Sequence, residues 1–333
     1  SMILHVMHYH NIAVDYMVGA QLEGLDTMVH LTEENDFMVL EGDEYLSSPI
    51  DRQPKFHLYQ PNIALISGIA WDHINVFPTY DNYVEQFEIF IDKITNGGIL
   101  VYNEDDAEVK RVSESATNPI RKLPYSTPAY SVSDGVTLLE TPEGPMPIEV
   151  FGAHNLNNLA GAKWICQNMG VDEADFYEAI ASFKGASKRL EKIAEGKGRV
   201  AYKDFAHSPS KVAATTKAVK EQYPNRTLVA CLELHTYSSL NAEFLKEYEG
   251  ALEYADEAVV FYSPDAVKIK QLEEVTYEQI AKAFNREDLI IYTNPAEFKQ
   301  YLFNRNLDNS ALLLMSSGNY GGLNFDEVKQ LIE

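Results

Sequence analysis

The sequence is poor in cysteine and lacks long apolar runs. Only two of its 333 residues are cysteines, Cys166 and Cys231, and they fall in different predicted elements. This argues against a disulfide scaffold, and we expect a reducing compartment, the cytoplasm. The longest apolar run, around Ile63 to Trp71, is far shorter than the roughly 20 residues that cross a bilayer, so no membrane partner is expected.

Basic residues are also scarce. The chain has 27 Lys and Arg against 50 Asp and Glu, a net charge of -23, which argues against nucleic acid as a partner. Small anionic ligands stay possible, because a local arginine, lysine or metal ion can dominate a site. With 45% hydrophobic and 23% charged residues, the chain is typical of a globular protein and is long enough for two domains.

A phosphate-binding loop is missing as well. No Gly-x-x-x-x-Gly-Lys-[Ser/Thr] occurs, and no Gly-x-Gly-x-x-Gly follows a predicted strand. Gly196-Lys197-Gly198 is followed by Arg199 and predicts a hairpin turn. Residues 2–7 read as the interior of a helix, with only Ser1 before them, so we expect the chain to be a piece of a longer protein.

Acidic and imidazole side chains follow two strands predicted in the first half. They are Glu41, Asp43 and Glu44 after the strand 37–40, and Asp72 and His73 after the strand 62–67. In an open α/β sheet, ligands bind outside the carboxyl ends of the strands, and carboxylates there suit Mg²⁺. An acidic turn and a histidine that caps a helix would explain the same pattern equally well.

The spacing of apolar residues predicts a mixed α/β fold. In the first half it predicts a helix over 79–94, a strand over 99–102, short β segments and loops over 113–147, a strand over 148–151, and helices over 154–169 and 172–183. After a hinge at 183–187, strands at 199–203, 227–232, 257–262, 289–292 and 311–316 alternate with helices at 209–222, 240–254, 276–284, 295–304 and 324–332. Such alternation predicts a parallel sheet with helices on both faces.

Several polar segments lie where a ligand would bind. Asn155, Asn157 and Asn158 open a helix, where amides either cap it or contact a base or a ribose. Lys188 and Arg189 at the hinge either clamp a phosphate or are merely solvated. Three strand-end loops follow in the second half: Asp204 to Pro209, Glu233 to Ser239, and Ser316 to Gly322. Each is also compatible with a plain turn.

Taken in order, these segments resemble the Mur ligase family. The ordered set is Glu41-x-Asp43-Glu44-Tyr45, Asp72-His73, His154-Asn155-x-x-Asn158, Arg189-Leu190-Glu191 and Asp204-Phe205-Ala206-His207-x-Pro209. The family consists of ATP-dependent enzymes that form an amide on UDP-N-acetylmuramate to build peptidoglycan precursors. The resemblance covers nearly the whole chain.

Three further stretches resemble the family's murein peptide ligase branch: 36–45, 51–56 and 315–323. That branch recycles L-alanyl-γ-D-glutamyl-meso-diaminopimelate onto UDP-N-acetylmuramate. The loop Glu233 to Ser239 is instead closer to the L-alanine-adding branch. A third alternative is a non-catalytic protein that binds a nucleotide or a peptide.

The resemblance implies a truncated central ATP-binding domain over 1–186 and a Rossmann-like C-terminal ligase domain over 187–333. The family's N-terminal UDP-binding domain and phosphate-binding loop would precede residue 1. We therefore expect this chain alone to be inactive and to bind ATP weakly.

The resemblance also implies roles for single residues. The residues implied for catalysis are Glu41, His73, Arg189 and His207, of which Glu41 and His73 would bind Mg²⁺. The residues implied for binding ATP are Asn155, Asn158, Arg189 and Asp204. The residues expected near the amine substrate are Glu233, His235, Ser316 and Asn319. Some members carry a carbamylated lysine. The corresponding region after His73 offers Glu85 and Glu88 but no lysine before Lys93, so no carbamate is expected.

Overall fold

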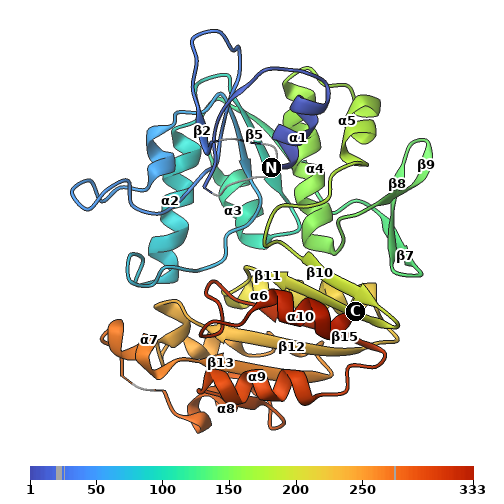
Figure 1. The fold of residues 1–333 in the computed structure, drawn as a ribbon. Helices are drawn as coiled ribbons and strands as arrows, with labels where there is room; N and C mark the ends of the chain where they lie inside the picture. Colours follow the sequence, from blue (N-terminus) through green and yellow to red (C-terminus); the bar gives the residue numbers. More distant parts are fainter. Residues whose placement is uncertain (20–24, 26, 274) are drawn as a thin grey trace. The chain divides into compact units, whose positions relative to one another are not determined.

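The computed structural model describes residues 1–333 apart from 20–24, 26 and 274. The chain divides into two compact units, Ser1–Ser187 and Lys188–Glu333 (Figure 1). Both contain parallel strands and helices, so the predicted α/β class is confirmed.

A small sheet lies near the start of the first unit. It follows helix α1 (Met2–Tyr9) and has the order β2-β1-β3, from Val29–His30, Asp15–Met17 and Met38–Leu40. Strands β1 and β3 are parallel, with Asp15 opposite Met38. The buried carboxylate of Asp15 accepts hydrogen bonds from the Thr32 backbone N–H and hydroxyl and from the Asn35 amide. These bonds fix the turn that leads into β3.

The central sheet of this unit has three parallel strands in the order β4-β5-β6 (Ile63–Ile66, Ile99–Asn103 and Arg121–Tyr125). Because side chains alternate along a strand, Val101 packs with helices α4 (Ala153–Asn168) and α5 (Glu173–Ile180), whereas Leu100 and Tyr102 pack with α2 (Tyr80–Asp92) and α3 (Ala107–Ser115). Helices thus cover both faces. The sequence analysis did not predict α3, and it placed α2, α4 and α5 correctly.

The predicted short β segments form a separate antiparallel meander. Strands β7 (Tyr130–Ser133), β8 (Val136–Thr141) and β9 (Gly144–Ile148) pair in that order. The strand expected over 148–151 is wrong, because β9 ends at Ile148. The next residues, including the buried Val150 and Phe151, lead to Gly152, which caps α4.

The second unit is built on one six-stranded sheet. Its order is β10-β11-β15-β12-β13-β14, from Glu191–Gly196, Arg199–Asp204, Ser310–Met315, Thr227–Leu234, Glu257–Tyr262 and Ile290–Tyr292. All neighbouring strands of this sheet pair in parallel except the first two. Strand β10 joins β11 as an antiparallel hairpin. The hairpin turn predicted at 196–198 is confirmed, although β10 itself was not predicted.

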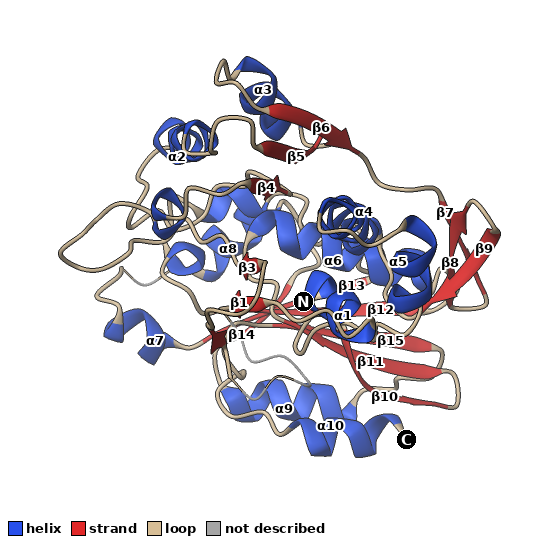
Figure 2. Cartoon of the chain, turned by 90° about the horizontal axis from the view of Figure 1, so that it is seen from above, coloured by secondary structure: helices blue, strands red, loops and turns tan. Residues whose placement is uncertain are grey.

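Helices cover this sheet on both faces, as expected. Helices α9 (Pro295–Asn304) and α10 (Phe325–Ile332) lie together on one side, where Phe298, Leu302 and Val328 join the core (Figure 2). Helix α6 (Pro209–Gln222) packs on β12 and β15, and α8 (Tyr277–Phe284) lies on the same side as α6 in Figure 2. Helix α7 (Pro264–Ile269) was not predicted.

The helix predicted over 240–254 is wrong. The segment forms two 3-10 turns, η2 (Ser238–Leu240) and η3 (Leu245–Tyr248), followed by irregular turns. Gly250 adopts a positive φ of 72°, which interrupts any continuous α-helix. The apolar pattern reflects burial of Phe244, Leu245, Tyr248 and Leu252 and not a helix.

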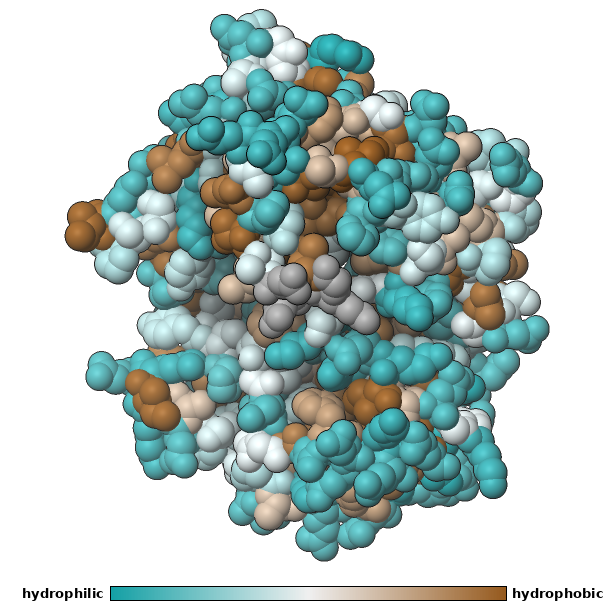
Figure 3. Space-filling view, turned by 45° about the horizontal axis from the view of Figure 1, so that its top comes forward, coloured by the Kyte–Doolittle hydropathy of each residue, from teal (hydrophilic) through white to brown (hydrophobic). Residues whose placement is uncertain are grey.

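Hydrophilic residues dominate the face seen in Figure 3, in keeping with the excess of acidic residues. Among the described residues, no helix is long and apolar enough to cross a membrane.

Candidate functional site

Glu41 directly follows β3, as predicted for a strand-end carboxylate. Its side chain is exposed and accepts a hydrogen bond of 2.8 Å from the Gly19 N–H. Glu41 is therefore held by a backbone contact while its carboxylate stays accessible from solvent.

His73 is held close to a different carboxylate. Its Nε2 lies 3.7 Å from Glu44 Oε1, and its ring packs edge-on against Tyr45. Glu44 also accepts a 3.0 Å hydrogen bond from the hydroxyl of Tyr83, and burial followed by the Glu44 charge raises the pKa of that hydroxyl. The sequence analysis named Glu44 as a strand-end acid but did not pair it with His73.

The residues predicted to bind Mg²⁺ are one carboxylate and one imidazole, Glu41 and His73, and the carboxylate that lies next to His73 in the structure is Glu44. Mg²⁺ is commonly bound by one or two carboxylates together with substrate phosphates and water, so a cage of protein ligands is not required. The described residues contain no cluster of three or more His, Cys, Asp or Glu that could hold a metal ion by itself. Glu41 and His73 stay predicted ligands, with Glu44 three residues after Glu41.

The two predicted adenine-contact residues lie at the start of α4. Asn155 donates to the carbonyl oxygen of Phe151 at 2.9 Å, which is a local contact near the start of the helix. Asn158 is exposed and is thus accessible to a ligand. Their contact with ATP stays a prediction.

Asn157, named from the sequence only as one of the amides that open this helix, lies in a buried polar network. Its amide nitrogen lies 2.9 Å from Asn103 Oδ1 and 3.2 Å from the Thr127 hydroxyl. Asn103 in turn donates to the Ser67 carbonyl, and Asp105 accepts from both the N–H and the hydroxyl of Thr127. The network ties the start of α4 to the carboxyl ends of β4, β5 and β6.

In the second unit, Arg189 and His207 both contact the ring of Phe205, the residue after Asp204. The guanidinium of Arg189 lies 5.3 Å from the centre of the Phe205 ring, and the His207 ring meets the same ring edge-on at 5.2 Å. Asp204 is buried, and Arg189 is exposed. Sequence reasoning named the three polar residues but did not identify the aromatic ring that Arg189 and His207 contact.

Three of the four predicted substrate residues meet at the carboxyl ends of the neighbouring strands β12 and β15. The buried Glu233 carboxylate accepts hydrogen bonds from the Ser316 hydroxyl and from the Tyr320 N–H, and His235 Nδ1 lies 3.6 Å from it. Burial by itself would raise the pKa of Glu233, but the His235, Ser316 and Tyr320 interactions outweigh it and lower the pKa below its ordinary value. The exposed Asn319 instead accepts the Gly322 N–H within its own turn.

Gly318 is needed for this arrangement. A Cβ at position 318 would lie 2.8 Å from the Glu233 carboxylate and 3.1 Å from the His235 ring. The loop after β15 can therefore pass directly over the acid and the imidazole only because this residue lacks a side chain.

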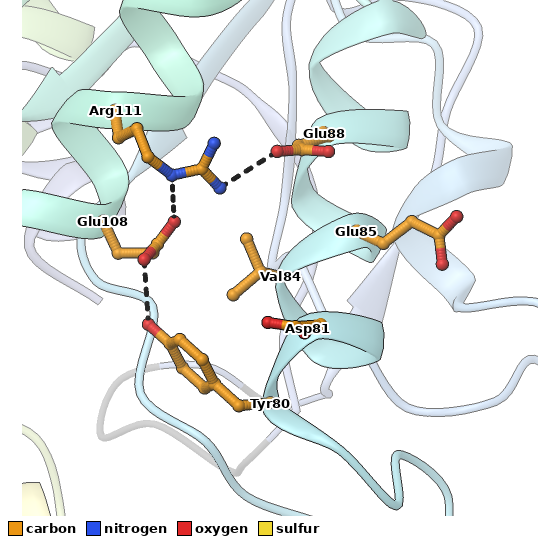
Figure 4. Close-up of a pocket in the computed structure, with 7 residues that line it drawn as sticks. All are labelled: Tyr80, Asp81, Val84, Glu85, Glu88, Glu108 and Arg111. Atoms are coloured by element: carbon orange, nitrogen blue, oxygen red, sulfur yellow. Dashed lines mark hydrogen bonds and ion pairs between the residues drawn. The ribbon is translucent and has the colours of Figure 1, made fainter.

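Glu85 and Glu88, named in place of a lysine, line a pocket of about 330 Å³ between α2 and α3 (Figure 4). Arg111 pairs there with Glu88 and Glu108, so the one arginine in the lining is already engaged by carboxylates. Burial and the neighbouring Glu108 raise the pKa of Tyr80 to about 12. The geometry assigns this pocket no chemistry.

The chain is therefore a protein of two α/β units in which polar residues collect at the carboxyl ends of parallel strands. Residues 15–166 match the Mur ligase middle domain, and residues 188–318 match the Mur ligase glutamate ligase domain. The chain belongs to the Mur ligase family.

Curated relatives agree with this assignment. The chain is 29% identical over 272 residues to the UDP-N-acetylmuramate–L-alanine ligase of Caldicellulosiruptor bescii, an alignment that covers 78% of this chain and 58% of the relative. It is 25% identical over 342 residues to the ligase of the same name from Alkaliphilus metalliredigens, covering 96% and 70%. The chain thus spans little more than half of the first relative.

Solved structures share the fold. A murein peptide ligase from Psychrobacter arcticus superposes with a TM-score of 0.66 at 18% identity, covering 100% of this chain and 74% of that one. MurF from Acinetobacter baumannii gives a TM-score of 0.71 at 15% identity, covering 95% and 70%. At these identities the likeness is one of fold.

The buried network predicts a strong effect of a nearly isosteric change at Asn157. Asn157→Asp replaces a donor by a carboxylate next to Asn103 Oδ1 and Asp105, so we expect a loss of about 1–3 kcal/mol in the free energy of unfolding. Urea unfolding followed by circular dichroism measures it. The matched control is Asn158→Asp, one residue along on the exposed face, expected to stay within about 0.5 kcal/mol. Equal effects of the two changes would contradict the network.

The lowered pKa of Glu233 predicts a pH dependence. Because the pKa is lower in the folded than in the unfolded protein, the stabilisation is complete above the ordinary glutamate pKa of about 4.3. It is lost as the pH falls through the lowered value. Glu233→Gln should therefore cost about 1–3 kcal/mol at pH 7, with the difference from the unsubstituted protein shrinking below about pH 4.

Thermal unfolding of both proteins across pH 3–8 checks this. Glu243→Gln, at an exposed carboxylate, is the control and should follow the unsubstituted protein throughout. If the loss of stability in Glu233→Gln were the same at every pH, this carboxylate would not be the group that titrates.

Proposed function

We propose that this chain is the catalytic part of an ATP-dependent ligase that joins an amine to the carboxylate of UDP-N-acetylmuramate. The observation that carries the proposal is the position of the motif residues. In each unit they lie at the carboxyl ends of strands: Glu41 after β3, and Asp204, Glu233 and Ser316 at β11, β12 and β15. This is where open α/β sheets bind their ligands.

The proposed reaction has two steps. A carboxylate oxygen of the muramate attacks the γ-phosphorus of ATP, the bond to the β-phosphate oxygen breaks, and ADP leaves. The amine nitrogen then attacks the carbonyl carbon of the acyl phosphate, the bond to the phosphate oxygen breaks, and the nitrogen gives up a proton. The products are an amide, ADP and phosphate.

The chain's own residues would position these groups and balance their charge. Phosphoryl transfer depends mainly on positioning and on neutralising charge. The exposed guanidinium of Arg189 suits a phosphate oxygen, and His207 packs edge-on against the same Phe205 ring. Glu41 and His73 would hold Mg²⁺, which lessens the repulsion between carboxylate and triphosphate.

The amine substrate has two candidates. The stretches 36–45, 51–56 and 315–323 favour the tripeptide L-alanyl-γ-D-glutamyl-meso-diaminopimelate. The curated relatives named above are L-alanine ligases, and the 233–239 loop resembles that branch, which favours L-alanine. In either case the Glu233 and His235 cluster would lie near the amine.

The test is a ligation assay on the full-length protein with UDP-N-acetylmuramate, ATP and Mg²⁺, using tripeptide or L-alanine as the amine. We expect release of ADP coupled to amide formation, with one amine preferred in kcat/KM by roughly 100-fold. Product mass spectrometry identifies the amide. No ligation with either amine would support the non-catalytic alternative, and the present 333-residue chain alone should be inactive.

Glu41→Gln serves as the active-site variant in this assay. We expect roughly a 100-fold loss of kcat/KM, because an amide replaces the predicted metal-binding carboxylate. Stability should not change, since the side chain is exposed and its amide oxygen can still accept the Gly19 N–H. Glu34→Gln, at another exposed acid, should keep full activity.

A further inference from the structure

Two residues in left-handed conformation flank Arg189. Lys188 has φ 57° and Leu190 has φ 45°, although neither is glycine. Side chains disfavour this conformation, and it persists only where the surroundings hold it firmly. Leu190 is buried and Arg189 is exposed, so the turn presents the arginine outward from an anchored base.

Three hydrogen bonds hold the turn. The Leu190 N–H donates to Asp204 Oδ2 at 2.6 Å, and the Phe205 N–H donates to the Lys188 carbonyl oxygen at 2.8 Å. The Lys188 N–H donates to Glu191 Oε2 at 2.8 Å. The last residue of β11 and the residue after it thus supply two of the three restraints.

The second oxygen of Asp204 is also engaged. Oδ1 accepts the Ala206 N–H at 2.6 Å, which fixes the turn that leads to His207. Only 7% of Asp204 is exposed. Each carboxylate oxygen therefore already binds a backbone N–H of the protein, so the side chain connects the turn 188–190 with the turn that follows β11.

The geometry points to Asp204 as a positioning residue that acts on the nucleotide through Arg189. Its carboxylate locks the turn 188–190 against the end of β11, so that the guanidinium rests over Phe205 in a fixed place before ATP arrives. This rests on the proposed function, and it gives Asp204 a role besides the contact with ATP that the family resemblance implies. A charged group that is already in position stabilises the transition state more than one that must first be ordered when the substrate binds.

A double-mutant cycle in the full-length protein tests the inference, with kcat/KM for ATP in the ligation assay as the readout. We expect Arg189→Ala to lower kcat/KM roughly 100-fold and Asp204→Asn to lower it roughly 10-fold. In the Arg189→Ala background, Asp204→Asn should then lower kcat/KM by clearly less than roughly 10-fold, because the group it positions is gone. Fully multiplicative losses would overturn the inference, since they would mean that Asp204 acts independently of Arg189.

Hydrogen–deuterium exchange of the peptide that contains residues 188–191 provides a readout that does not depend on activity. Asparagine keeps one acceptor oxygen but turns an NH₂ group toward one of the two N–H donors. We expect faster exchange in Asp204→Asn than in Arg189→Ala. If exchange in Asp204→Asn were unchanged, Asp204 would not hold the turn 188–190. If the unsubstituted protein showed no ATP-dependent ligation, the proposed function would be overturned, even if Asp204 were shown to hold the turn.

Discussion

The parallel pairing of β15 between β11 and β12 is the constraint on which the second unit depends. In register, Asp204 lies opposite Met315, and Leu232 lies opposite the same residue on the other side. Residues at the ends of these three strands are therefore brought to one edge, although Asp204 and Ser316 are 112 positions apart in sequence. The Ser316 N–H donates to the Asp204 carbonyl oxygen, and the Ser316 hydroxyl reaches Glu233. One strand thus links the turn that carries Arg189 to the acid expected near the amine.

The first unit uses the same principle with different chemistry. Glu41 stands beyond a strand end with an exposed carboxylate, whereas Asn103 and Asn157 hold strand ends and helix together from within. The exposed groups are available to ligands, and the buried amides keep the surrounding loops in place. The charge of Glu41 at the surface and the neutral amides of Asn103 and Asn157 in the interior agree with the high cost of burying an unpaired charge. The buried carboxylate of Asp15 is accordingly hydrogen-bonded to Thr32 and Asn35.

Much of this was predictable from sequence, because strand ends are marked by apolar runs that stop at polar residues. Glu41, Asp204 and Glu233 were predicted at strand ends in this way, and the structure places them there. The burial of Asn157 was not predicted, since a buried amide and its exposed neighbour Asn158 look alike in a sequence. The segment 240–254 has helical apolar spacing, but Gly250 and tertiary packing override it. The contacts of the Phe205 ring were not predicted, because the sequence does not indicate which side chains pack against an aromatic residue.

If the Glu233 and His235 cluster lies near the amine as proposed, the lack of a side chain at Gly318 limits how the range of amines can diversify. With the backbone of the β15 loop pressed against Glu233 and His235, that loop cannot gain a group at position 318 without displacing both. Selectivity for a small or a large amine would then be tuned from the facing loop after β12, where Tyr237 is exposed. The loop after β15 would then be the fixed wall of the site and the loop after β12 the wall that can change. A library of variants aimed at new amines is therefore best directed at the loop after β12.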